Sequence, residues 1–273
     1  MKISCIPVVL FPQIIAGGMS LGSWARMASE IGLDGIDLST LFLRNHTPVY
    51  LVSVVKELEA EGMAVVMIAA YPDFSHPDRT QRERELEYLR GDIALASQIG
   101  ARYLRILAGQ AHPETQVQEG IGWVAENFKQ AAATAERFHV QLVYENHSKP
   151  SSWFLSDFSH PTQVFLEIAE RIRDTGIGLN FDTANVIAYG DDPRDLLGQI
   201  VDRVVTVHAA DTSTRGKLTL TALGTGRVPF NELFSVLKRH GFDNWISLED
   251  GSKDAREGLA RARTFVRRVW DEA

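Results

Sequence analysis

The sequence predicts an α/β protein folded as a single (β/α)₈ barrel over residues 1–273. Eight short apolar segments, rich in β-branched residues and bounded by turn residues, alternate with segments in which apolar residues return every three or four positions. Strict alternation of this kind predicts a parallel sheet, because parallel strands need a helical crossover between them. Eight such units in 273 residues fit a closed barrel better than an open doubly wound sheet.

The predicted strands are short and apolar through the middle, as strands buried on both faces must be. They are Lys2–Pro7, Gly35–Ser39, Ala64–Ala69, Tyr103–Ala108, Gln141–Glu145, Gly178–Asp182, Val204–His208 and Trp245–Glu249. The only cysteine, Cys5, lies in the first strand, so no intramolecular disulfide can form and a buried structural thiol is expected. Residues 11–18 lack the glycine spacing of a nucleotide-binding turn, which counts against an open sheet.

The predicted helices follow the strands in order and show helical periodicity. They are Leu21–Ile31, Val49–Glu61, Thr80–Ile99, Glu119–Phe138, Pro161–Arg171, Pro193–Ile200, Pro229–His240 and Ala255–Trp270. Prolines at three helix starts and glycines just beyond four helix ends support these bounds, namely Pro161, Pro193, Pro229, Gly32, Gly62, Gly100 and Gly241.

Composition excludes several classes of protein. A hydrophobic fraction of 45% with 23% charged residues supports a core without disulfides. The formal net charge of −7 offers no basic surface for nucleic acid. No segment approaches the roughly 18 uninterrupted apolar residues of a membrane span, so a cytoplasmic protein with no membrane partner is expected. The composition does not decide the oligomeric state, and both a monomer and a homo-oligomer are compatible with it.

Four consecutive predicted strands end in a carboxylate or an imidazole, namely Glu145, Asp182, His208 and Glu249. Active sites of such barrels form at the carboxyl ends of the strands. Since neighbouring strands lie roughly 4.8 Å apart, these side chains can converge on one point over the mouth. Three carboxylates there would repel one another, and a divalent cation removes that repulsion. The pattern predicts one divalent metal ion, with Mn²⁺ as the first expectation and Mg²⁺, Co²⁺ or Zn²⁺ as alternatives.

The strand-end motifs resemble those of the xylose isomerase-like TIM barrels, which include the sugar phosphate isomerase/epimerase and apurinic endonuclease families. The resemblance spans nearly the whole chain, and D-tagatose 3-epimerase-like enzymes, hydroxypyruvate isomerase and inosose dehydratase have a similar ligand pattern and order. Its carriers are Tyr-Glu145-Asn-His, Gly-Leu-Asn-Phe-Asp182-Thr-Ala-Asn, Val-His208-Ala-Ala-Asp, Leu223-Gly-Thr-Gly226 and Ser-Leu-Glu249.

The resemblance implies a sugar isomerase or epimerase of carbohydrate metabolism. A divalent ion that chelates a hydroxy-ketone acidifies the adjacent C–H and stabilises the resulting enediolate. The resemblance also implies that Glu145 and Glu249 act as the acid/base pair on opposite faces of the substrate carbon. A lyase or dehydratase acting on an inosose, a 3-keto-sugar or its glycoside is the alternative. A non-catalytic sugar-binding barrel and a nuclease are weaker readings.

Further residues near the predicted mouth are candidates for the substrate site. His147 is a candidate additional base, and the alternative is that it only supports neighbouring site residues or packs the loop. Arg105 lies inside a strand and needs a buried partner, for which Glu145 is the expected choice. Expected substrate-contacting residues are Asn185, Arg215, Arg105, Trp153 and Tyr71. Trp153, Tyr71 and Phe11 are predicted to lie in loops at the mouth and to form aromatic walls of the site.

One position departs from the family pattern. Many relatives carry histidine three residues after the sixth-strand aspartate, whereas this chain has Asn185. An amide still hydrogen-bonds a hydroxyl but does not titrate near neutrality. This departure leaves the substrate open and counts against a three-zinc nuclease. No Lys/Arg cluster falls at the predicted mouth, which favours an unphosphorylated sugar or glycoside.

Overall fold

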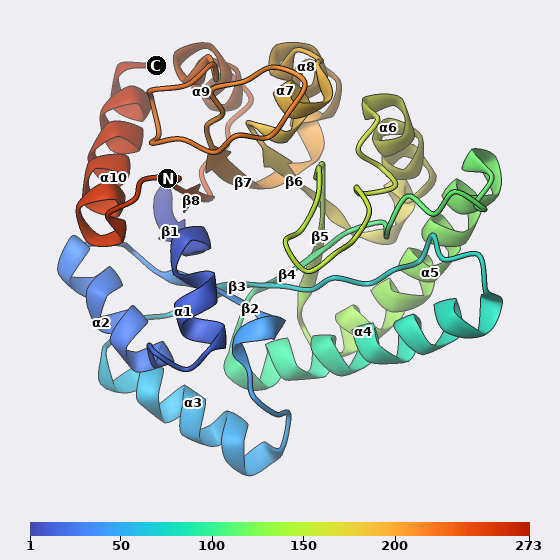
Figure 1. The fold of residues 1–273 in the computed structure, drawn as a ribbon, viewed down its shortest axis with the longest axis horizontal. Coiled ribbons are helices and arrows are strands. Elements are labelled where there is room, and N and C mark those ends of the chain that lie inside the picture. The colour runs from blue at the N-terminus through green and yellow to red at the C-terminus, as the bar shows by residue number, and fades with distance from the viewer.

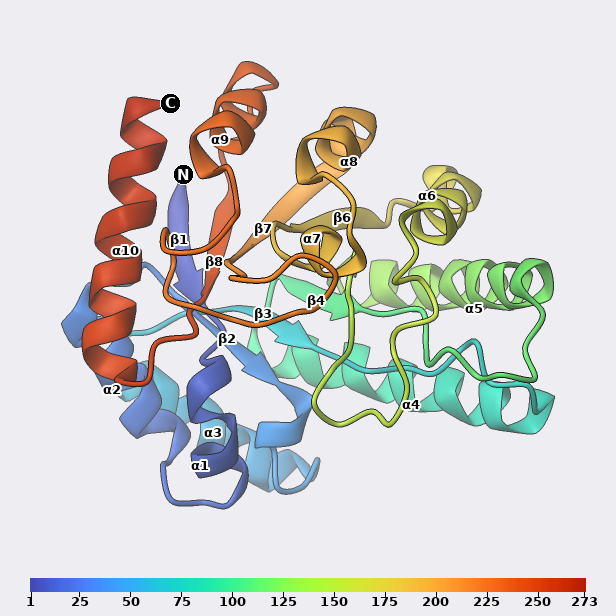
Figure 2. The same cartoon turned by 45° about the horizontal axis from the view of Figure 1, so that its top comes forward.

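The computed structural model describes residues 1–273 as a ring of eight parallel strands with helices outside it (Figures 1 and 2), which confirms the predicted TIM barrel. The strands are β1 Lys2–Cys5, β2 Ile36–Ser39, β3 Val65–Ala69, β4 Tyr103–Ile106, β5 Gln141–Glu145, β6 Gly178–Asp182, β7 Val204–Ala210 and β8 Trp245–Glu249. The helices are α1 Phe11–Ile15, α2 Leu21–Ile31, α3 Pro48–Ala60, α4 Arg79–Ile99, α5 Val117–Arg137, α6 Thr162–Arg171, α7 Asn185–Tyr189, α8 Pro193–Ile200, α9 Phe230–Arg239 and α10 Ala255–Glu272.

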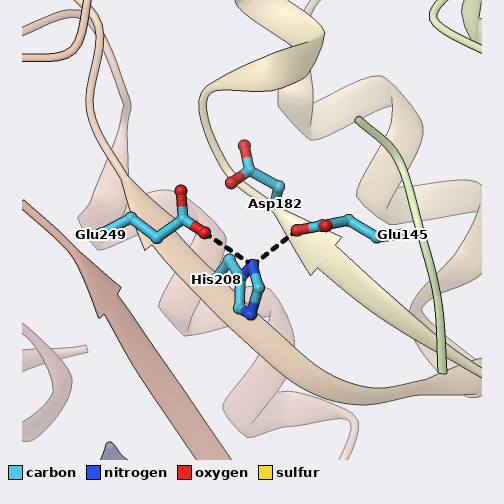
Figure 3. A group of neighbouring side chains, drawn as sticks. All are labelled: Glu145, Asp182, His208 and Glu249. Carbon is cyan, nitrogen blue, oxygen red and sulfur yellow. Dashed lines mark ion pairs between the residues drawn. The ribbon is translucent and has the colours of Figure 1, made fainter. Parts of the chain in front are cut away.

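The strands hydrogen-bond in the order β1-β8-β7-β6-β5-β4-β3-β2, and every pair is parallel. Their carboxyl ends therefore lie together at one mouth of the barrel, part of which is seen close up in Figure 3. No backbone ladder joins β1 to β2. Instead, the Asp34 amide donates to the Ile3 carbonyl at 2.8 Å, and Ser4 Oγ donates to Asp37 Oδ2 at 3.0 Å. We call this junction the seam.

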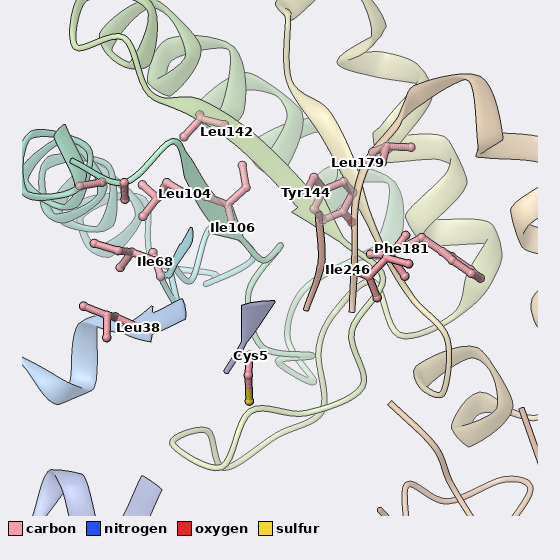
Figure 4. Packing of buried hydrophobic residues seen from close by; sticks show 14 of the residues in the cluster. Cys5, Leu38, Ile68, Leu104, Ile106, Leu142, Tyr144, Leu179, Phe181 and Ile246 are labelled. Carbon is pink, nitrogen blue, oxygen red and sulfur yellow. The ribbon is translucent and has the colours of Figure 1, made fainter. Parts of the chain in front are cut away.

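The core lies between the ring and its helices, because alternate strand residues point outward to the helices. Figure 4 shows part of this layer, including Leu38, Ile68, Leu142 and Phe181, within one cluster of 67 buried residues. Cys5 belongs to the same cluster and is a free, buried thiol. Burial and nearby carboxylates raise its pKa well above the usual value, which fits the predicted structural role.

The buried interior of the ring contains both apolar and polar side chains. Met67, Tyr103 and Val143, from three neighbouring strands, are buried together. The buried polar side chains of the strands include Ser4, Asp37, Arg105, Asn180, Thr206 and Ser247. Strand pairing sets Asp37 beside Met67 and Arg105 beside Val143, so apolar and polar residues lie next to each other on paired strands.

Local signals explain where most helices begin and end. Ser20 and Asp254 accept backbone N–H bonds at the starts of α2 and α10, and Gly32 ends α2 with a φ of 82°. Each predicted element ends within two residues of its observed bounds. Sequence reasoning placed Phe11 in a loop, which is wrong, because Phe11 begins the short helix α1. None of the helices combines the length and apolar character needed to cross a bilayer.

Candidate active site

Four neighbouring strands bring Glu145, Asp182, His208 and Glu249 together over the mouth (Figure 3). One potential ligand atom from each residue lies within 4.8 Å of those of the others. His208 Nδ1 lies 2.6 Å from Glu145 Oε1 and 3.0 Å from Glu249 Oε1. The first three residues are buried, and the Glu249 side chain is 15% exposed, so the group opens towards the mouth at Glu249.

Glu145 is held by two polar partners besides His208, and a third residue orients one of them. Arg105 Nε lies 3.1 Å from Glu145 Oε2, which confirms the predicted pairing of this buried cation. Asn180 Nδ2 donates to Glu145 Oε1 at 2.9 Å, and Thr206 Oγ1 donates to Asn180 Oδ1 at 2.7 Å. Burial raises the pKa of Glu145, but His208 and Arg105 outweigh it and hold the pKa at about 2. The carboxylate is therefore fixed and ionised.

Asp182 is oriented by the start of α7. Its Oδ1 accepts backbone N–H bonds from Ala184 at 2.8 Å and Asn185 at 2.7 Å. Its backbone N–H and carbonyl are both bound by the Asn146 side chain at 2.9 Å. Asp182 Oδ2 has no hydrogen-bond partner although it is buried, so one oxygen is anchored and the other is available to a ligand.

The charges of the group fit a divalent ion. Burial and the charges of Glu249 and Glu145 raise the pKa of Asp182 well above its usual value. Burial lowers the pKa of His208, but the charges and hydrogen bonds of Glu145 and Glu249 raise it by more. The pKa of His208 therefore lies well above its usual value. Carboxylate and imidazole ligands lie about 2.0–2.2 Å from Zn²⁺, so ligand atoms within 4.8 Å of one another suit a shared ion.

A cavity of about 280 Å³ adjoins this group, close to the lower end of the usual size of ligand sites, about 300–1,000 Å³. Its polar side is formed by Tyr71, Arg105, His147, Lys149 and Glu249, and its apolar side includes Ile6, Val8, Phe11, Leu218 and Leu220. A larger cavity of about 670 Å³ lies between the end of α5 and the turn before β6 and contains none of the candidate residues. The smaller cavity is therefore the candidate substrate site.

The motif Leu223-Gly-Thr-Gly226 shapes the loop that follows β7. Asp211, at the start of that loop, accepts backbone N–H bonds from Gly224, Gly226 and Val228 at 2.8–3.1 Å. A Cβ on Gly226 would lie 2.2 Å from Asp211 Oδ1, so only glycine fits there. The carboxylate thereby folds the loop back on itself, and Leu218 and Leu220 of this loop reach the cavity.

The model of the family described as xylose isomerase-like TIM barrel matches residues 25–268 of this barrel. The chain belongs to this family. L-ribulose-5-phosphate 3-epimerase UlaE of Escherichia coli (strain K12 / DH10B) is 22% identical over 275 residues, which cover 96% of this chain and 94% of the relative. The chain is an enzyme, and relatives of this kind support the isomerase and epimerase class.

Solved structures show the same fold along the whole chain. D-psicose 3-epimerase from Clostridium cellulolyticum H10, solved with D-tagatose, has a TM-score of 0.81 at 12% identity and covers 99% of both chains. The IOLI protein, solved with a bound zinc atom, has a TM-score of 0.80 at 17% identity and covers 100% of this chain and 99% of its own. These similarities show the TIM-barrel fold, and active sites of such barrels form at the carboxyl ends of the strands.

The predicted substrate residues fall into two groups. Tyr71, Arg105 and His147 line the cavity, and the Arg105 guanidinium lies 4.8 Å from the centre of the Tyr71 ring. Asn185 and Arg215 do not line it. Asn185 Oδ1 accepts the Ser148 N–H at 3.1 Å, and the Arg215 guanidinium donates to the Gly190 carbonyl over a separate surface hollow.

Trp153 also lies outside the cavity, buried in the loop between β5 and α6. That loop contributes Lys149 to the cavity instead. Sequence reasoning missed two residues of the site, Lys149 and Asn180. No local sequence pattern marks Lys149 as a cavity residue, whereas the strand period does mark Asn180. Asn180 lies two residues before Asp182 on the same strand, so the two-residue period of a strand places both side chains on one face.

Asp157, in the same loop, makes the stability of the fold depend on pH. Its carboxylate is buried, and burial raises its pKa to about 8 despite two hydrogen bonds from Ser159. An acid whose pKa is raised by folding holds its proton in the folded state and loses it when unfolded, so stability falls as pH rises from about 4 to 8. We expect Tm to fall less over this range in metal-free Asp157→Asn than in the wild type, as measured by calorimetry with a chelator. Parallel curves for the two proteins would contradict this.

Proposed function

We propose that this enzyme is a divalent-metal-dependent sugar epimerase or isomerase that moves a proton at a carbon next to a carbonyl. The observation that carries the proposal is the convergence of three carboxylates and one imidazole on a single point beside a cavity of small-molecule size. The family and its sugar epimerase relatives agree with this chemistry. The substrate we propose is a small ketose or a close derivative.

Glu145, Asp182, His208 and Glu249 would hold the ion. A bound divalent ion withdraws electrons from a hydroxy-ketone and acidifies the C–H beside the carbonyl. Mn²⁺ is the ion we propose, because carboxylate oxygens outnumber the one nitrogen ligand and leave a hard, oxygen-rich site. Zn²⁺, Mg²⁺ and Co²⁺ are the competitors that a metal analysis separates.

Glu145 and Glu249 are the proton-transfer pair that we propose. They approach His208 Nδ1 from different strands, β5 and β8, and so lie on either side of the space between them (Figure 3). Glu249 also lines the cavity, where a substrate carbon is in reach. A base on each side of one carbon removes a proton from one face and returns a proton to the other, which inverts the configuration.

His147 is the further acid/base residue that we propose. It lines the cavity, and its Nδ1 is buried without a hydrogen-bond partner. Burial lowers its pKa to about 4, so the imidazole is neutral near pH 7 and can accept a hydrogen bond from a substrate hydroxyl. Lys149 and Arg105 give the same cavity two cations, so phosphorylated and free ketoses both belong among the substrates to be screened.

The deciding experiment measures metal content by elemental analysis and activity on a panel of free and phosphorylated ketoses. We expect about one equivalent of a divalent ion in the wild type, and much less in Glu145→Gln and His208→Ala, because each variant removes one of the four ligands. Activity should disappear with a chelator and return with Mn²⁺. Glu232→Gln, a change at an exposed acid on α9, is the matched control and should keep both metal and activity.

The outcomes separate the candidate functions. Deuterium incorporation from solvent into a recovered ketose supports an epimerase or isomerase. An unsaturated product would instead show a lyase. A wild-type protein that takes up no ion after incubation with Mn²⁺ and Zn²⁺ would refute the metal-dependent mechanism.

A further inference from the structure

Asp37, on β2, is a buried carboxylate that the proposed reaction does not use. It is fully buried inside the barrel, where an ionised group needs polar partners. Ser4 Oγ donates to its Oδ2 at 3.0 Å across the seam. Its other oxygen, Oδ1, has no hydrogen-bond partner. Because buried polar atoms are normally hydrogen-bonded, the free Oδ1 of Asp37 indicates that a hydrogen-bond donor lies close by.

Strand register carries a row of polar residues from the candidate ligands to Asp37. Asp182 on β6 is paired with His208 on β7, His208 with Ser247 on β8, and Ser247 with Ser4 on β1. Ser4 then binds Asp37 across the seam. The row therefore leads across neighbouring strands from the site to the carboxylate.

The buried polar atoms of the barrel that lack hydrogen-bond partners include His208 Nε2, Ser247 Oγ and Asp37 Oδ1. These three atoms can form a chain of two hydrogen bonds. An imidazole N–H donates, a hydroxyl both accepts and donates, and a carboxylate accepts. Burial raises the pKa of Asp37 to about 6, and the nearby Ser247, His208 and Ser4 all oppose that rise. Ser247 is therefore placed to donate to the carboxylate, and strand pairing sets His208 beside Ser247.

We propose that Asp37 is a positioning residue for His208, acting through Ser247. The His208 Nε2–H donates to Ser247 Oγ, and the Ser247 hydroxyl donates to Asp37 Oδ1. This relay keeps the proton of the neutral imidazole on Nε2 and leaves Nδ1, which faces Glu145 and Glu249, free to bind the ion. The proposal deepens the proposed function, since it rests on His208 serving as a metal ligand.

The test compares Zn²⁺ affinity, by competition with a chromophoric chelator, among the wild type, Asp37→Asn and Ser247→Ala. We expect each variant to bind Zn²⁺ about 10–100-fold more weakly, the range for outer partners of a ligating histidine. Because both changes break one relay, the double variant should lose little more than either single variant. Asp92→Asn, which neutralises another largely buried carboxylate on α4, is the matched control and should bind Zn²⁺ like the wild type.

A second readout does not depend on the metal. In ¹⁵N-histidine-labelled, metal-free protein, the wild type should show a His208 Nε2–H signal that exchanges slowly with water, assigned by its absence in His208→Asn. Asp37→Asn and Ser247→Ala should each speed its exchange at least tenfold. Unchanged exchange, or full additivity of the Zn²⁺ losses, would overturn the relay. If the wild type binds no Zn²⁺, the proposed function fails, while the exchange measurement still decides whether the relay exists.

Discussion

Glu249→Gln is expected to stop the interconversion of two epimers. Only one of the two epimers should still exchange the hydrogen at its reacting carbon with solvent. General acid–base groups contribute about 10²–10⁴-fold to a rate, so turnover should fall by about that factor. Glutamine keeps the size of the side chain and removes the carboxylate that lines the cavity. Glu145, whose hydrogen bonds come from Asn180 rather than Glu249, stays in place to act on its own face.

The measurement follows deuterium by NMR with each epimer in turn, with Mn²⁺ in excess so that weaker ion binding does not obscure the result. One epimer should gain deuterium at the reacting carbon and return unchanged, and the other should not react. Glu145→Gln should show the reverse preference. Equal exchange with both epimers in either variant would refute the assignment of one base to each face.

Arg105→Met is expected to cost the most stability of any single change near the site. Arg105 and Glu145 are both buried, and removing one partner of a buried ion pair costs about 3–5 kcal/mol because the other charge stays unpaired. The pKa of Glu145, held at about 2 in the wild type, should rise, since Arg105 is one of the groups that lower it. Its depressed pKa stabilises the wild-type fold above about pH 4 and ceases to do so as pH falls towards 2.

The stability difference between the wild type and Arg105→Met should therefore be large at pH 7, partly retained at pH 4, and small only as pH approaches about 2. It is measured by urea unfolding with a chelator present, because a bound ion would partly replace the lost positive charge. Arg82→Met is the matched control, since Arg82 is a largely buried arginine with no carboxylate partner and packs on Trp123. A difference that does not change with pH would show that Arg105 acts through packing rather than through charge.

The barrel and its four candidate ligands are predictable because both depend on local patterns. Short apolar strands alternate with helices, and Glu145, Asp182, His208 and Glu249 each come where an apolar strand ends. Parallel order then converts four positions far apart in sequence into neighbours at one mouth. The buried partner of Arg105 follows from the same logic, because a cation inside a strand needs an anion within reach.

Loop residues are less predictable, because their direction depends on contacts that no local pattern encodes. Arg215 lies away from the cavity, where its guanidinium donates a hydrogen bond to the Gly190 carbonyl. The side-chain oxygen of Asn185 accepts the Ser148 N–H and so binds the loop that follows β5. Lys149 and Leu218 line the cavity from the loops that follow β5 and β7.

The seam is the one junction in the ring of strands that lacks a backbone ladder. β5 to β8, which carry the four candidate ligands, form an unbroken arc of paired backbone, whereas β1 and β2 are joined by few bonds, of which one is Ser4 to Asp37. Ile6, Val8 and Phe11, which follow β1, form the part of the cavity wall beside the seam. Changes in that wall can alter which sugars fit without moving the ligands, so this architecture allows substrate preference to diverge in evolution while the chemistry is retained.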